Sequence, residues 1–293
     1  MPKLKQIAKE EKMNRYKIYL KYLKAKRKYN CTYEEFLKLK LFKIPFTNIP
    51  TFLIEDNNAS LIKVYNNETF FNNFLETKTF LETFHKLLNY DYLILNDLEN
   101  FKTFIKDKQE IIANNKQIPV NKDDIEQQFN TLIKQHTKYI TSSYNLCPEL
   151  LQISEDISFI RFITFNCNII SAYLFIPNKK EYIFAPINLE TGIVDFIFTD
   201  NNNNTYDKSP STNTSLIWYH IPKWQKLTRH VIKCSEQIEE IKYSSWDLTI
   251  SEDGPILLSA SPTPDIDYLQ LPIHRTQKYG IMKQINEIRK EEL

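Results

Sequence analysis

The side chains that most often carry out chemistry are sparse in this chain of 293 residues. Its five histidines are scattered, and no H-E-x-x-H pair or Cys/His cluster has the spacing of a zinc site. No serine lies between two glycines as in the G-x-S-x-G elbow of hydrolases. Phosphate loops of the G-x-G-x-x-G and P-loop types need two or three glycines close together, but Gly192, Gly254 and Gly280 lie far apart. The sequence therefore excludes the standard zinc, serine-hydrolase and nucleotide-loop motifs.

Residues 243–258 form the most specific motif of the chain. A strand-like run carrying Trp246-Asp247 is followed by Asp253-Gly254 and a second apolar run, and Asp-Gly is a strong hairpin signal. This segment resembles the C-terminal signature of the sugar-transfer-associated ATP-grasp family. Four more segments resemble motifs of that family in the same order, namely 147–164, 189–192, 206–210 and 221–224. The resemblance covers the chain from about residue 139 to residue 270.

The resemblance implies a fold in which two α+β subdomains hold ATP between them. In that family a lysine contacts the phosphates, a glycine-rich loop covers them, and Asp, Glu and Asn oxygens hold magnesium, which prefers oxygen ligands. Phosphoryl transfer to a carboxylate gives an acyl phosphate, which an amine then attacks. Carried over by position, the resemblance assigns catalytic roles to Arg161 and Asp247 and makes Asp247 the metal ligand.

The family's other nucleotide and metal positions carry different residues in this chain. Ser259 and Ser261 stand where a Glu-x-Asn pair should hold magnesium, and a neutral hydroxyl is a poor substitute for a carboxylate. The phosphate lysine expected directly after residues 111–112 is absent, so Lys116 is the candidate cofactor-binding residue. No glycine lies in the lid region 114–125. ATP and Mg²⁺ are the expected cofactors if the chain is active, and no cofactor is expected otherwise.

Three hypotheses for function follow. The combined loss of lysine, lid and magnesium ligands favours a degenerate, accessory or repurposed member of a cell-surface glycan or polysaccharide biosynthesis pathway. Arg161 and Asp247 would then form a salt bridge or a cap within the retained scaffold. The alternative is an active, divergent ATP-dependent carboxylate–amine ligase that uses both residues to modify a sugar or amino-acid substrate. The third hypothesis is a peripheral membrane or nucleic-acid-binding protein that acts through residues 1–30.

Positive charge is concentrated at the N-terminus. Residues 1–30 carry eleven lysines and arginines against two glutamates, although the whole chain has a formal charge of only +2. Because residues 3–29 lack proline and glycine, they predict one basic, partly amphipathic helix. Three interpretations of such a helix compete: a solvated helix that packs on the domain, a helix that lies on an anionic membrane surface, and a helix that binds nucleic acid. Nucleic acid is disfavoured, since the remainder of the chain is net negative.

The expected location is the cytoplasm, with a peripheral position at the membrane if the basic helix binds lipid. No run of about 18 apolar residues is present, so no transmembrane helix is expected. The N-terminus is too charged for a secretory signal. Four cysteines without C-x-x-C spacing indicate free thiols. Enzymes of glycan biosynthesis are the expected partners.

Helical and strand-like segments alternate along the chain. Thr32 and Glu35 predict a capping box at the start of a helix, and residues 51–65 predict one or two strands around a turn at 55–58. Further helices are expected at 70–88, 101–108, 123–138 and 223–241. Further strands are expected at 92–95, 110–112, 157–165, 169–175, 182–187, 193–199, 245–250 and 255–258.

Helices interleaved with antiparallel-looking strands indicate the α+β class. Together with the resemblance, this pattern predicts an ATP-grasp-like fold of two subdomains with a basic helical N-terminal extension. The expected division is 1–45 for the extension, 46–138 for the N-terminal subdomain and 139–293 for the C-terminal subdomain.

Overall fold

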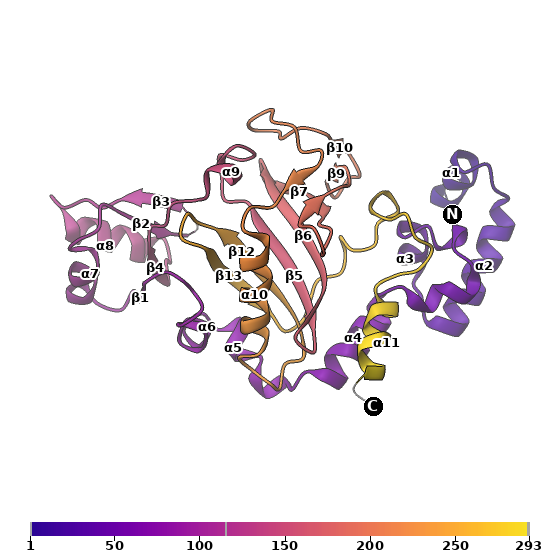
Figure 1. Cartoon of the computed structure of the whole chain (residues 1–293), viewed down its shortest axis with the longest axis horizontal. Coiled ribbons are helices and arrows are strands. Elements are labelled where there is room, and N and C mark those ends of the chain that lie inside the picture. Colours follow the sequence, from indigo (N-terminus) through magenta and orange to yellow (C-terminus); the bar gives the residue numbers. More distant parts are fainter. Residues whose placement is uncertain (1, 115, 292–293) are drawn as a thin grey trace.

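The computed structural model describes residues 2–114 and 116–291. Its helices interleave with a small and a large antiparallel sheet, which confirms the α+β class. Figure 1 shows the large sheet in the middle, the small sheet on one side and the N-terminal helices on the other.

The elements have the following bounds. The α-helices are α1 (Pro2–Glu10), α2 (Arg15–Tyr29), α3 (Tyr33–Lys38), α4 (Glu55–Tyr65), α5 (Asn72–Leu75), α6 (Thr77–Phe84), α7 (Leu98–Ile105), α8 (Ile125–Lys134), α9 (Pro148–Leu151), α10 (Trp224–Ser235) and α11 (Met282–Glu291). The 3-10 helices are η1 (Leu41–Lys43), η2 (Phe46–Thr51), η3 (Glu68–Phe70) and η4 (Pro272–His274). The strands are β1 (Tyr92–Ile94), β2 (Glu110–Ala113), β3 (Lys116–Pro119), β4 (Tyr139–Ser142), β5 (Phe159–Phe165), β6 (Asn168–Asn178), β7 (Glu181–Pro186), β8 (Ile193–Val194), β9 (Phe198–Thr199), β10 (Thr205–Tyr206), β11 (Tyr219–His220), β12 (Tyr243–Ile250) and β13 (Pro255–Ser261).

The large sheet has the strand order β10-β9-β7-β6-β5-β12-β13, and its neighbours pair antiparallel. Its central strands are rich in isoleucine, phenylalanine and tyrosine, whose branched or aromatic side chains suit a buried pleated surface. The strands predicted at 157–165, 169–175, 182–187, 245–250 and 255–258 are confirmed here, as is the hairpin at Asp253-Gly254 that joins β12 to β13. The single strand predicted at 193–199 is wrong, because this segment is divided between β9 in the large sheet and β8, which pairs with β11 in a separate two-stranded sheet. This strand order places Arg161 on β5 directly opposite Asp247 on β12.

Both faces of the large sheet are covered. On one face, side chains such as Phe162 and Trp246 pack in one apolar cluster with α10 and with the α5–α6 segment. On the other face, Phe165, Tyr173 and Tyr243 pack with α4, α11 and the segment before α11. Figure 1 shows α4 and α11 lying beside each other at this face. The second face is the one that carries the candidate site residues.

A tight turn before β8 packs directly on the start of α10. Gly192 has a φ of +71°, and a Cβ at this position would lie 2.4 Å from Cγ of Trp224. The indole Nε1 of Trp224 donates a hydrogen bond to the carbonyl of Leu189 at 3.1 Å. Glycine is therefore required at the turn both by the backbone conformation and by the indole ring. Trp224 is buried in the core.

The small sheet has the strand order β1-β4-β2-β3 and packs against α7 and α8 around a separate apolar cluster. Its strands β1 and β2 confirm the predictions at 92–95 and 110–112, and β1 is half-buried. Helices α7 and α8 confirm the helices expected at 101–108 and 123–138, with α8 ending earlier.

The N-terminal segment forms two helices, so the prediction of one helix over residues 3–29 is wrong. The helical conformation is interrupted between α1 and α2, where Lys12 takes a φ of 51°. Asn14 then caps α2, because its side chain accepts hydrogen bonds from backbone N–H groups of the first turn. Local capping overrides a helical periodicity that runs continuously in the sequence. Both helices pack with α3, η1 and η2 around an apolar cluster drawn from residues 4–54.

The strands predicted for residues 51–65 are also wrong, because helix α4 occupies most of this segment. Asn57 closes the start of the helix: its Oδ1 accepts from the backbone N–H of Ile54 at 2.7 Å, and its amide donates to the carbonyl of Phe52 at 2.8 Å. Two acidic residues in the first turn add favourable charge at the positive end of the helix dipole. Residues 55–58, which the sequence predicts to form a turn, are thus the first turn of helix α4.

Five other sequence predictions have clear outcomes. The capping box of Thr32 and Glu35 is confirmed, while the helix expected at 70–88 is divided between α5 and α6. The helix expected at 223–241 ends at Ser235. All four cysteines are free thiols. Within the described ranges, no helix is long and apolar enough to cross a bilayer. The division of the chain at residues 45 and 138 stays a prediction.

Candidate functional site

A cavity of about 1220 Å³ lies where the small sheet meets the large one. Strands β2, β3 and β4 supply one wall, and β5, β12, β13 and the turn between β6 and β7 supply the other. The cavity brings together Lys116, Arg161, Asp247 and Ser259, which sequence reasoning had placed in one site. Their assigned roles in catalysis and binding stay predictions.

Arg161 and Asp247 form a two-pronged ion pair across adjacent strands. The guanidinium Nε lies 2.7 Å from Oδ1 of Asp247, and Nη2 lies 2.8 Å from Oδ2. The side chains are 24% and 14% exposed, so the pair is largely desolvated. A bidentate guanidinium–carboxylate pair fixes both groups in position as well as in charge. Both oxygens of the carboxylate are therefore already engaged by a cation.

Ser259 closes this arrangement from the next strand. Its hydroxyl donates a hydrogen bond to Oδ2 of Asp247 at 2.9 Å, and the two residues are directly paired between β12 and β13. The register between the two strands shifts directly after Asp247, where β13 carries the extra residue Leu258. Arg161, Asp247 and Ser259 are called the closed network below. Ser261, the second substituted magnesium position, instead hydrogen-bonds to Thr263 and does not line the cavity.

Aromatic rings surround the guanidinium of the closed network. Its central carbon lies 5.6 Å from the ring centroid of Phe159, 5.2 Å from that of Phe175 and 5.8 Å from that of Tyr268. Burial by itself would lower the pKa of Arg161, but the hydrogen bonds and charge of Asp247 raise that pKa above its ordinary value. The guanidinium of Arg161 is thus permanently charged. The carboxylate of Asp247 opposite it stabilises this charge in its largely buried position.

Two lysines and three further acidic residues line the same cavity. Lys116 lies at the start of β3, and Lys179 lies in the turn between β6 and β7 with a φ of 57°. Among the residues that the structure describes, no salt bridge engages either ammonium group. The acidic residues of the lining, outside the closed network, are Glu155, Asp156 and Glu252. The acidic groups outnumber the free cations in the cavity.

Sequence reasoning missed Lys179 and the acidic pair before β5. The signal for Lys179 was a polar Asn-Lys-Lys run between two strand-like segments, which marks a hairpin tip but not the direction of the side chain. Tyr144 and Tyr182 also line the cavity, and burial raises the pKa of the Tyr144 hydroxyl. These residues reach the site only because the small and large sheets pack together.

The family profile described as sugar-transfer associated ATP-grasp matches residues 124–290, which is more than half of the chain. The chain belongs to this ATP-grasp family. The match contains the whole closed network and leaves Lys116 just outside its N-terminal end. A comparison with curated proteins found no match.

Solved structures with a related chain path are ATP-grasp ligases. The ligase PsnB, complexed with precursor peptide PsnA2 and AMPPNP, is 12% identical with a TM-score of 0.43, covering 69% of this chain and 54% of its own. The macrocyclase MdnC, bound with precursor peptide MdnA from Microcystis aeruginosa MRC, is 12% identical with a TM-score of 0.44, covering 80% of this chain and 68% of its own. D-alanine–D-alanine ligase from Bacillus anthracis is 11% identical with a TM-score of 0.45, covering 80% of this chain and 76% of its own. This ATP-grasp chain thus spans about half the length of PsnB.

The residues of the ATP-grasp cavity do not fit a magnesium ion. Magnesium binds through one or two carboxylates in near-octahedral geometry, with phosphate oxygens and water completing the shell. Here the carboxylate at the expected position is neutralised by Arg161 and hydrogen-bonded by Ser259. No ligation step through magnesium follows from this donor set.

The electrostatics of the cavity also disfavour a polyphosphate. A nucleotide triphosphate carries several negative charges, which require cations or a metal around them. With Arg161 already paired, Lys116 and Lys179 face three acidic groups. The lid region 114–125 contains no glycine, and Lys116 begins the hairpin strand β3 within it. The cavity therefore lies between the two sheets with acidic groups in excess of unpaired lysines.

Proposed function

We propose that this protein is a degenerate ATP-grasp member that has kept the cavity between its sheets but no longer carries out magnesium-dependent ligation. The closed network is the observation that carries this proposal. A metal at Asp247 would meet a carboxylate whose charge Arg161 already offsets and which already accepts hydrogen bonds at 2.7, 2.8 and 2.9 Å. Exchanging Arg161 for the metal would break the buried ion pair. Removing one partner of a buried ion pair costs on the order of 3–5 kcal/mol, which opposes that exchange.

The proposed role is that of an accessory or repurposed protein in the biosynthesis of a cell-surface glycan or polysaccharide. The family's description as sugar-transfer associated supports this context. Enzymes of that pathway are the proposed partners, and the cavity is the proposed binding site for a shared ligand. The cytoplasm is the proposed location.

Adding Mg-ATP is expected to leave the thermal unfolding midpoint unchanged. A ligand that binds only the native state stabilises it by RT ln(1 + [L]/Kd), which is about 2.7 kcal/mol when its concentration is 100 times Kd. A titration into the millimolar range, followed by differential scanning fluorimetry, would reveal any such binding. Magnesium alone and ATP with EDTA are the matched conditions.

The alternative is an active, divergent carboxylate–amine ligase, and the retained Lys116 and Lys179 are the observation that favours it. A concentration-dependent rise of the midpoint with Mg-ATP that disappears with EDTA would establish this alternative. It would equally contradict the degenerate function. Lys116→Ala should abolish such a rise if Lys116 contacts the phosphates, whereas Lys86→Ala, a lysine outside the cavity, should not.

A second candidate function rests on helix α2. Tyr16, Leu20 and Leu23 are 64%, 59% and 40% exposed, and their spacing of four and three residues places them on one side of the helix. Exposed basic residues flank this stripe: Lys17, Lys24, Lys26, Arg27 and Lys28. An apolar stripe between cations fits the boundary between lipid headgroups and acyl chains in an anionic membrane. We propose that α2 holds the protein at such a membrane surface.

The full chain is expected to sediment with vesicles containing phosphatidylserine and not with pure phosphatidylcholine vesicles. Each basic residue near an anionic surface contributes about 1 kcal/mol, so the two affinities should differ at least tenfold at low salt. Leu20→Glu with Leu23→Glu should remove this binding. Val64→Glu on α4 is the matched control, since Val64 is also an exposed apolar residue. Equal binding to both vesicle types, or binding to a single-stranded RNA instead, would contradict the membrane role.

A further inference from the structure

A second cavity, of about 630 Å³, lies on the same face of the large sheet as the first. Alternate residues of a strand point to the same face. On β6, Ser171 and Tyr173 line the second cavity, and Pro177 lines the first. The opposite wall is the segment 270–287, which includes η4 and the start of α11. The two cavities therefore lie toward opposite ends of one strand.

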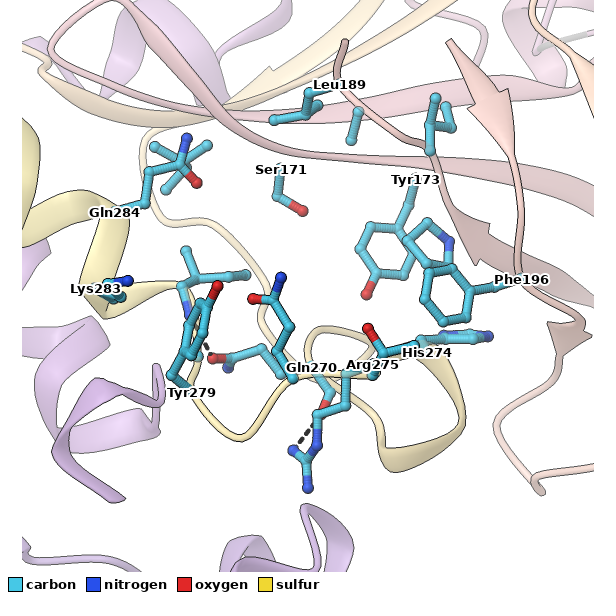
Figure 2. Close-up of a pocket in the computed structure, with 18 of the residues that line it drawn as sticks. Ser171, Tyr173, Leu189, Phe196, Gln270, His274, Arg275, Tyr279, Lys283 and Gln284 are labelled. Carbon is cyan, nitrogen blue, oxygen red and sulfur yellow. Dashed lines mark hydrogen bonds between the residues drawn. The ribbon is translucent and has the colours of Figure 1, made fainter. Parts of the chain in front are cut away.

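Neutral polar side chains converge on this second cavity. In Figure 2 the hydroxyl of Ser171 projects into it from β6, and the rings of Tyr173 and Tyr279 stand on opposite sides of it. Ser171 is only 8% exposed, and its hydroxyl makes no hydrogen bond within residues 2–114 and 116–291. Nearly buried hydroxyls in proteins normally have a partner. The free hydroxyl of Ser171 is thus available to a molecule in the cavity.

The charged residues of the lining offset one another or point elsewhere. The guanidinium of Arg275 donates to the carbonyl of Gln270 at 2.8 Å and to that of Leu39, and Figure 2 shows it directed away from the cavity centre. The ammonium of Lys283 lies 3.9 Å from a carboxylate oxygen of Glu287, one turn further along α11, and 4.4 Å from the ring centroid of Tyr279. In the described lining, a phosphate or a carboxylate would therefore meet only Lys283, whose charge the neighbouring Glu287 offsets.

Aromatic rings form the remaining wall. The imidazole of His274 lies 6.0 Å from the ring of Tyr173 and 6.2 Å from that of Phe196, centroid to centroid. The side-chain amide nitrogen of Gln284 donates a hydrogen bond to the carbonyl of Ile169 at 3.4 Å. The side-chain carbonyl oxygen of Gln284 is left as an acceptor. Ring faces bind C–H surfaces, while hydroxyls and amides both donate and accept hydrogen bonds. Saccharides present both kinds of surface.

We propose that this second cavity is a binding site for a neutral saccharide, with Ser171 and Gln284 bonding its hydroxyls and Tyr279 covering its ring. The site is separate from the cavity of the closed network. It does not depend on whether that cavity binds nucleotide. It gives the protein a means of recognising sugar directly.

Saturation-transfer NMR with glucose and N-acetylglucosamine as probes tests this site on the full chain. Saturation transfer to at least one of the two is expected at millimolar concentrations. Ser171→Ala should raise its Kd about threefold or more, as expected for the loss of one hydrogen bond. Tyr279→Ala should raise it about tenfold, by removing both ring and hydroxyl. Tyr279 is partly exposed, so this variant is expected to fold.

Tyr182→Ala is the matched control, because Tyr182 is a similarly exposed tyrosine that lines the first cavity. It should leave sugar binding unchanged. Binding that is lost in Tyr182→Ala and kept in Tyr279→Ala would overturn the assignment to the second cavity. Tighter binding of glucose 6-phosphate than of glucose would overturn the neutral chemistry. Absence of saturation transfer from both sugars would overturn the proposal as a whole.

Discussion

Replacing Asp247 with asparagine is expected to lower the free energy of unfolding by about 3 kcal/mol. The variant keeps the size of the side chain and removes the charge that neutralises Arg161. The guanidinium would then remain largely buried among three aromatic rings without a carboxylate. Urea denaturation at pH 7 measures this loss.

The matched control is Asp267→Asn. Asp267 pairs with Lys38 at 2.7 Å, but both side chains are well exposed to solvent. Exposed pairs contribute about 0–1 kcal/mol, so this variant should lose far less stability than Asp247→Asn. Combining Arg161→Met with Asp247→Leu should recover most of the loss, because apolar side chains of similar size often replace a buried ion pair at little cost.

A loss below about 1 kcal/mol for Asp247→Asn would place the carboxylate in the same class as exposed pairs. Asp247 would then be free to serve as a metal ligand, and the degenerate function would lose its main support. The same variant therefore tests both the energetics of the closed network and the function proposed from it.

The fold of the second half followed from the sequence because each signal there was local and consistent. Strands rich in branched and aromatic residues, with Asp253-Gly254 between two of them, specify the β12–β13 hairpin without further information. The first third was harder, since helical periodicity alone cannot show that Asn14 caps a new helix. In the same way, residues 55–58 read as a turn until Asn57 is seen closing the start of α4.

The candidate site was predicted in part. Arg161, Asp247 and Ser259 were located through the family motif, and strand pairing then brings them together. Their mutual hydrogen bonds could not be derived from the sequence, because a bidentate pair depends on rotamers set by the surrounding rings. The second cavity gave no sequence signal at all, since Ser171 and Tyr279 are far apart in the chain and meet only through tertiary packing.

The two cavities are separated by a tyrosine that belongs to the core. The ring of Tyr268 lies 5.0 Å from that of Tyr173, which lines the second cavity, and 5.8 Å from the guanidinium carbon of Arg161, which lines the first. Burial raises the pKa of the Tyr268 hydroxyl well above its ordinary value. An apolar aromatic partition of this kind keeps the charged network and the neutral cavity chemically distinct.

Lowering the pH from 7 to 4 is expected to cost about 3 kcal/mol of stability through His274 alone. Burial lowers the pKa of this imidazole from 6.5 to about 4. Its Nε2 must carry the proton, because it lies 2.9 Å from the carbonyl of Ile197, and its Nδ1 is buried without a partner in the described residues. The folded protein therefore resists protonation, while the unfolded chain takes up a proton below pH 6.5. Stability is full above pH 6.5 and falls as the pH drops toward 4.

The comparison that isolates this effect is His274→Phe, which keeps a ring against Tyr173 and Phe196 but cannot titrate. Its stability at pH 7 falls because the carbonyl of Ile197 loses its donor, so the quantity to compare is the change between pH 7 and pH 4. That change should be about 3 kcal/mol smaller in the variant than in the unmodified protein. His230, whose pKa burial also lowers, and the carboxylates titrate in both proteins and cancel in this difference. Equal pH dependence of the two proteins would mean that His274 is protonated as readily in the folded state as in the unfolded chain.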